Sequence, residues 1–138
     1  MFKKIFQQSY KMISFEDMQH VLQNTRKYII INTLPTNEQS CLIKNTLNYQ
    51  TEEKTINDLI NLYNYTENTF IIYGRNVNDT SIEDKYSQIA GLGFMNVYLY
   101  RGGMFEWLLL QDIYGKDEFP TTTYVLDILK YKPLKIFE

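Results

Sequence analysis

The 138-residue sequence predicts an α/β fold in which a parallel sheet carries helices on both faces. Three apolar stretches, at residues 27–31, 70–73 and 97–100, are rich in β-branched or aromatic residues, as is typical of strands that are buried on both faces. Helical patterns of about ten to twelve residues separate them, and this alternation is typical of βαβ units.

The first third of the chain contains one expected helix and two expected edge strands. Ser14 followed by acidic residues predicts the start of a helix at about 15–24. Short strands are expected at 11–13 and 41–43, in addition to the longer strand at 27–31.

Two further helices are expected between residues 51 and 91. The first has an apolar stripe at helical spacing, formed by Ile56, Leu59, Ile60 and Tyr63. Thr80 with Glu83 three residues later predicts a capping box for the second helix.

After the strand at 97–100, a Gly-Gly turn leads into a helix that Gly115 ends. Phe105, Leu108 and Leu109 are expected on the inner face of that helix, and a last helix is expected at about 121–131. Because the chain has no internal repeat and no long linker, we expect a single domain over residues 1–138.

The stretch from Gly93 to Trp107 reads GFMNVYLYRGGMFEW and is similar to the closing signature of rhodanese-like domains, where a Gly-Phe, a strand, a Gly-Gly turn and a Trp follow in this order. With the strand at 28–31 and, loosely, residues 41–46, the resemblance covers about 11–113 and leaves 114–138 as a helical extension. It implies a five-stranded parallel sheet in the order 1-5-4-2-3, with helices on both faces.

The same resemblance places the active-site loop directly after the strand at 70–73. In active members a cysteine ends this strand and carries a persulfide, and a basic residue often closes the loop. Here Gly74 stands at the expected cysteine position and Asp79 at the position that is often Arg, and no cysteine occurs between Thr69 and Trp107. The resemblance therefore implies a catalytically inactive domain, with neither catalytic residues nor a cofactor, that acts as a protein-binding or scaffolding module.

The candidate binding site is this degenerate loop together with a nearby arginine: Gly74, Arg75, Asn76, Val77, Asn78, Asp79 and Arg101. Arg75 and Arg101 each follow a predicted strand, and ligands bind at the carboxyl edge of an open parallel sheet. The two arginines could together hold an anion or a partner's carboxylate.

Three other residues are weaker candidates. Cys41 could serve a sulfurtransferase or another thiol enzyme, but its apolar setting favours a small buried side chain. His20 is the only histidine and has no evident nucleophile to serve, and Ser81 is explained by helix capping. A further alternative is a structural assembly component, a homo-oligomer that uses its tyrosine-rich surface.

Composition excludes several classes of protein. A net charge of −2 argues against a nucleic-acid partner, and a single cysteine gives neither an internal disulfide nor a metal cluster. No apolar run reaches the ~20 residues of a membrane span. We expect an intracellular, cytoplasmic protein, or one of a host cell's cytoplasm or a virion if the Asn- and Ile-rich composition reflects a large DNA virus.

Overall fold

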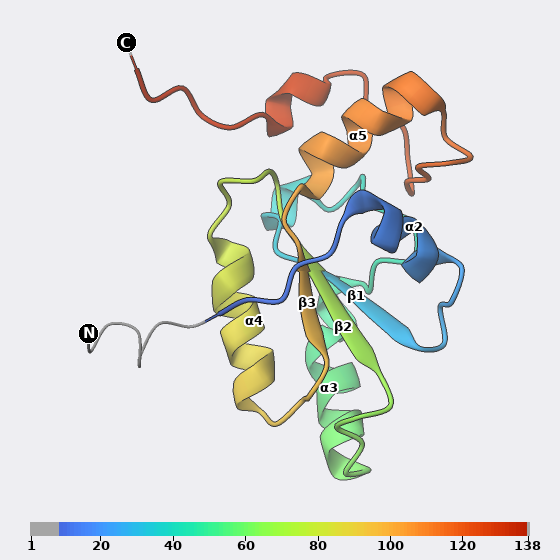
Figure 1. The fold of residues 1–138 in the computed structure, drawn as a ribbon, viewed down its shortest axis with the longest axis vertical. Helices are drawn as coiled ribbons and strands as arrows, with labels where there is room; N and C mark the ends of the chain where they lie inside the picture. Colours follow the sequence, from blue (N-terminus) through green and yellow to red (C-terminus); the bar gives the residue numbers. More distant parts are fainter. Residues whose placement is uncertain (1–8, 138) are drawn as a thin grey trace.

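The computed structural model describes residues 9–137, and residues 1–8 and 138 lie outside the described part (Figure 1). Its centre is a parallel sheet of three strands in the order β1-β2-β3: β1 (Tyr28–Asn32), β2 (Thr69–Tyr73) and β3 (Val97–Tyr100). Ile30 pairs with Ile71 of β2, which in turn pairs with Tyr98 of β3. These strands confirm the three expected from their apolar runs.

The expectation of five strands is corrected, because the described residues form three. The segments at the two edges pair at single residues only: Met12 with Leu99, and Thr46 with Ile30. At one edge the helix capped by Ser14 begins directly after this contact, and at the other Asn45 has a positive φ of 69° that interrupts extended backbone.

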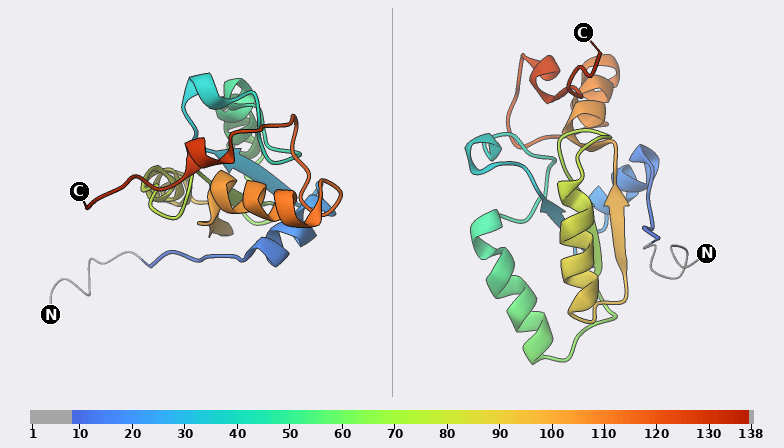
Figure 2. Two further views of the ribbon diagram at one scale, coloured as in Figure 1. Left: turned by 90° about the horizontal axis from the view of Figure 1, so that it is seen from above. Right: turned by 90° about the vertical axis from the view of Figure 1, so that its left-hand side faces the viewer.

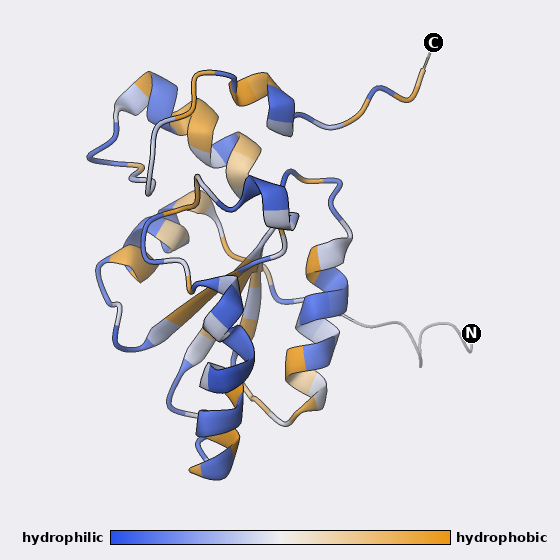
Figure 3. Ribbon diagram, turned by 180° about the vertical axis from the view of Figure 1, so that it is seen from behind, coloured by the Kyte–Doolittle hydropathy of each residue, from blue (hydrophilic) through white to orange (hydrophobic). Residues whose placement is uncertain are grey.

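Helices cover both faces of the sheet (Figure 2). On one face lie α2 (Phe15–Leu22) and α5 (Gly103–Tyr114), whose Met18, Val21, Trp107 and Leu108 are buried in the same cluster as Ile30 and Ile71. On the other lie α3 (Glu52–Asn61) and α4 (Ser81–Gly91), packed through Ile56, Ile82 and Ile89 on Ile31, Phe70 and Ile72. Figure 3 shows the apolar strands between helices with largely hydrophilic outer turns. No helix in residues 9–137 is long and apolar enough to cross a membrane.

The expected helix starts and faces are partly corrected. Ser14 caps α2 through a capping box with Asp17, as its sequence position predicts. Tyr63 lies beyond the end of α3 with a φ of 55° and is 84% exposed, so it does not belong to the buried stripe. Leu109 is 39% exposed, because α5 turns Met104, Trp107, Leu108 and Gln111 inward instead.

The helix expected at 121–131 is wrong, and the extension after α5 is mostly irregular. Its one helical turn is the short 3-10 helix η3 (Ile128–Tyr131). Phe119 and Tyr131 are buried, the indole N–H of Trp107 donates to the carbonyl of Pro120, and the backbone N–H of Thr122 donates to that of Leu42. These distant contacts hold the segment against α5 and residues 41–43, which outweighs its local helical pattern.

Candidate functional site

The candidate loop begins where β2 ends and leads into α4, at the carboxyl edge of the sheet. It is held from below by the turn between β3 and α5: the backbone N–H of Met104 donates to the carbonyl of Gly74, at 3.0 Å, and that of Phe105 to the carbonyl of Arg75, at 2.9 Å. Gly103 has a φ of 67°, and a Cβ there would lie 2.6 Å from the carbonyl oxygen of Gly74. Only glycine therefore fits this contact between turn and loop.

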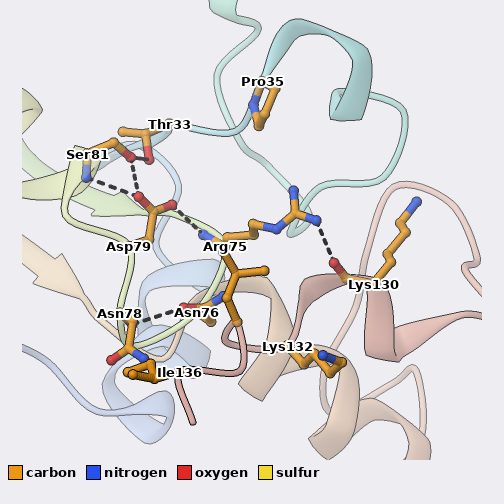
Figure 4. A pocket seen from close by; sticks show the side chains of 11 residues that line it. Thr33, Pro35, Arg75, Asn76, Asn78, Asp79, Ser81, Lys130, Lys132 and Ile136 are labelled. Carbon is orange, nitrogen blue, oxygen red and sulfur yellow. Dashed lines mark hydrogen bonds between the residues drawn. The ribbon is translucent and has the colours of Figure 1, made fainter. Parts of the chain in front are cut away.

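The carboxylate of Asp79 turns back into the loop (Figure 4). One of its oxygens accepts the backbone N–H of Arg75 at 2.9 Å, and the other accepts the backbone N–H of Ser81 at 3.0 Å and the hydroxyl of Ser81. Asp79 rather than Thr80 thus satisfies the first turn of α4, which corrects the expected Thr80 capping box. A backbone donor of the loop and one at the helix N-terminus, the usual elements of an anion site, are thereby bound to a carboxylate of the chain itself.

Gly74 lies directly beneath this carboxylate. A Cβ on Gly74 would be 2.3 Å from the Oδ2 atom of Asp79 and 2.9 Å from the hydroxyl oxygen of Thr33. The φ of Gly74 lies outside the left-handed region, so the obstacle is these side chains and not the backbone. A side chain at position 74 can enter the loop only if Asp79 and, to a smaller extent, Thr33 move.

Arg75 binds the body of the protein. Its guanidinium donates to the carboxylate of Glu38 and to the carbonyl of Lys130, and lies 5.6 Å from the ring centre of Tyr131. Burial raises the pKa of the Tyr131 hydroxyl to about 12. The contacts of the Arg75 guanidinium with Lys130 and Tyr131 attach the loop to the C-terminal segment.

The side chain of Asn76 also attaches the loop to the C-terminal segment, and it binds the backbone of Asn78. The buried Asn76 side chain donates to the carbonyl of Tyr131 at 2.9 Å and accepts the backbone N–H of Asn78 at 2.9 Å. Val77, at the tip of the loop, is 52% exposed. The loop thus has a rigid base and an accessible tip.

Arg101 lies apart from Arg75. It donates to the carboxylate of Glu83 at 2.7 Å and to the sulfur of Met12 at 3.4 Å. The structure does not bring the two arginines together on one ligand: Arg75 lines the pocket above the loop, and Arg101 does not.

A pocket of about 650 Å³ opens above the loop, between β1, α4 and the C-terminal segment. Besides loop residues and the weaker candidate Ser81, it is lined by several residues that the sequence did not point to: Thr33, Pro35, Lys130, Lys132, Leu134 and Ile136. Its C-terminal wall comes from residues more than 50 positions away from the loop, and no local pattern in the sequence indicates that contact.

Of the three weaker candidates, Ser81 lines this pocket and donates its hydroxyl to Asp79, whereas Cys41 and His20 lie elsewhere. Cys41 is 1% exposed, and its thiol donates to the carbonyl of Thr123. His20 lies on α2 beside the ring of Tyr28, along a different pocket. Among residues 9–137 there is no group of His, Cys, Asp and Glu side chains that could hold a metal ion.

This arrangement of sheet, helices and loop is that of a rhodanese-like fold, and comparison with solved structures supports it. A yeast protein tyrosine phosphatase of the rhodanese family matches with a TM-score of 0.56 and 16% identity over 88% of this chain and 98% of its own. A protein from Bacillus halodurans matches with a TM-score of 0.58 and 19% identity over 83% and 77%. An As-Sb reductase from Leishmania major matches with a TM-score of 0.51 and 17% identity over 77% and 79%.

At these identities the similarity shows the fold alone, because related folds carry different chemistries. No family model and no curated protein matches the sequence. The rhodanese-like fold expected from the Gly93–Trp107 signature is thus confirmed at the level of architecture.

Proposed function

We propose that this chain is a catalytically inactive rhodanese-like domain that binds a protein partner through the face around the loop 74–79. The observation that carries the proposal is the carboxylate of Asp79, bound by the backbone N–H groups of Arg75 and Ser81 directly above Gly74.

The chemistry of this loop supports inactivity. Sulfur transfer and cysteine-dependent phosphate hydrolysis both need a thiolate at the end of β2, and Gly74 has no side chain. A second anion close to Asp79 would be repelled by about 1 kcal/mol or more in a partly wet site. The one cysteine, Cys41, is buried away from the loop and offers no accessible nucleophile.

The surface around the loop supports a protein partner. The apolar side chain of Val77 is 52% exposed at the tip of the loop, between Asn76 and Asn78, which line the pocket. A rigid base with an exposed apolar tip suits a binding surface, since little conformational entropy is lost when it is covered.

Enzyme assays test the inactivity. We expect no turnover above background with thiosulfate and cyanide, or with an aryl phosphate, and no change in Cys41→Ser. Turnover by the wild-type chain that Cys41→Ser abolishes would establish the thiol enzyme and overturn the proposal.

A restored thiol tests the role of Asp79 directly. In Gly74→Cys the new thiol should react slowly with iodoacetamide, because the adjacent carboxylate opposes its ionisation. In Gly74→Cys/Asp79→Ala it should react at least about tenfold faster. Equal rates in the two variants would mean that Asp79 does not fill the anion site.

The binding face can be located with a photo-crosslinking residue. Placed at Val77, it should capture the partner from extracts of the source cell, whereas at Leu62, which is 73% exposed at the end of α3, it should not. Capture from Leu62 alone would place the partner elsewhere. Sedimentation at rising concentration separates the homo-oligomer, since a strict monomer excludes self-assembly.

A further inference from the structure

The last described residues, 132–137, form what we call the C-terminal arm. They follow η3 with neither helix nor strand, and among residues 9–137 no hydrogen bond holds residues 133–137. Figures 1 and 2 show the arm running outward from η3 and α5. The arm therefore passes the open side of the pocket above the loop, and among the described residues no hydrogen bond of residues 133–137 holds it there.

The arm carries large apolar side chains that the domain does not cover. Leu134 is 86% exposed, Ile136 80% and Phe137 84%. One exposed apolar residue is ordinary on a soluble protein, but three within four positions form a patch that favours an apolar contact.

Lysines alternate with these apolar side chains. Lys130, Lys132 and Lys135 are exposed, and no carboxylate of the described residues lies within 4.0 Å of their amino groups. The sequence has no acidic residue from 130 to 137, and Glu138 adds one negative charge after it. A cluster of positive charge thus stands at the end of a chain whose net charge is −2.

We propose that the C-terminal arm, together with the adjacent Lys130 of η3, binds an anionic lipid surface, with Lys130, Lys132 and Lys135 at the headgroups and Leu134, Ile136 and Phe137 in the apolar boundary. Alternating cationic and apolar residues suit this boundary, which requires no particular shape of the segment that enters it. The arm is also long enough. Six extended residues reach about 20 Å, and charges are screened within about 8 Å at physiological salt, so the acidic domain does not cancel the attraction.

Vesicle co-sedimentation of the full chain tests the lipid contact. We expect binding to phosphatidylcholine vesicles that contain phosphatidylserine, little to phosphatidylcholine alone, and weakening as salt rises. Replacing Lys130, Lys132 and Lys135 by Gln should lower the partition coefficient about a hundredfold, since each lysine near such a surface contributes about fivefold.

A matched control makes the same change in net charge at three lysines in other parts of the chain. Lys27, Lys44 and Lys54 are also exposed, and replacing these three by Gln should leave binding close to that of the wild type. An equal loss in both triple variants would show that only the overall charge matters and would overturn the role of the arm.

A spectroscopic readout reports the apolar contact. In Phe137→Trp the new indole is exposed, whereas Trp107 is fully buried, so a blue shift of emission on phosphatidylserine vesicles reports insertion at position 137. Replacing Leu134 and Ile136 by Ser in this background should weaken the shift. No shift, or equal binding to neutral vesicles, would overturn the proposal, and capture of a protein by the arm without lipid binding would assign the arm to a protein partner instead.

Discussion

The turns after β2 and β3 both contain glycine and look alike in sequence. They differ in which atoms exclude a side chain at the glycine. Each strand ends in a buried tyrosine, Tyr73 or Tyr100, followed by an arginine that forms an ion pair and by glycine. At Gly103 the atom that excludes a side chain is the backbone oxygen of Gly74, whereas at Gly74 it is the carboxylate of Asp79. The backbone of the fold therefore requires Gly103, whereas the side chains of Asp79 and Thr33 require Gly74.

The largest effect is expected for Gly103→Ala. Its φ of 67° and the 2.6 Å approach to a backbone oxygen should cost about 3 kcal/mol of unfolding free energy, measured by urea denaturation. Gly91→Ala is the control, because a Cβ there meets nothing within 4 Å in α4, and it should be neutral or stabilising by up to about 1 kcal/mol. Similar losses in both variants would contradict the steric reading of the turn.

Asp79→Ala should destabilise by about 2 kcal/mol, since it leaves the backbone N–H groups of Arg75 and Ser81 without their acceptor. Gly74→Ala should be costly in the wild-type chain and clearly less costly in the Asp79→Ala background, where of the two close side chains only Thr33 remains. A double-mutant cycle measures this coupling. Additive effects would show that Asp79 is not what limits position 74.

The difference in stability loss between Arg75→Ala and Arg101→Ala should be smaller than the effects at Gly103 and Asp79. Arg75→Ala removes the partner of Glu38, whose second oxygen is buried without a hydrogen bond among the described residues, and should cost about 1 to 2 kcal/mol. Arg101→Ala breaks a pair with Glu83, whose carboxylate is more exposed than that of Glu38, and should cost about 0.5 kcal/mol. Urea denaturation at low and high salt measures the loss of unfolding free energy in both variants. A larger loss in Arg101→Ala than in Arg75→Ala would contradict this prediction.

The smallest effect concerns alkaline pH. Burial raises the pKa of Tyr73, of Tyr100 and, to about 12, of Tyr131 above the ordinary value of 10. The neutral forms are favoured in the folded state, so their stabilisation is complete below pH 10 and falls as the unfolded chain ionises first. The stability against urea should therefore fall between pH 10 and 12, and it should fall less steeply in Tyr131→Phe. Tyr124→Phe, at a side chain that is 57% exposed, is the control.

The local patterns were sufficient to predict the strands and most helices. The apolar runs at 28–31, 70–73 and 97–100 each predict a buried strand and nothing else, and Ser14 predicts a helix N-cap. The errors fall where distant contacts decide: residues 121–131 pair with residues 41–43 and α5 instead of forming a helix.

In the candidate loop, too, some features can be predicted from the local sequence and others depend on the folded chain. The position of the loop after β2 and the absence of a cysteine between Thr69 and Trp107 are visible in the sequence, but the direction of the Asp79 side chain is not, because an acidic residue before a helix can face solvent or the loop. The partners of Arg75 likewise depend on Glu38 and Lys130, which only the folded chain brings close.

The hydrogen bond from Asn76 to the carbonyl of Tyr131 also sets the shortest chain that can fold as this domain does. A truncation after residue 113, where the family resemblance stops, would remove Phe119 from its contact with Trp107 and strip the cover from Cys41 and Leu42. A truncation after Tyr131 would spare all of these contacts. Limited proteolysis from the C-terminus should accordingly trim the arm and stop at Tyr131, which makes residue 131 the boundary of the minimal domain.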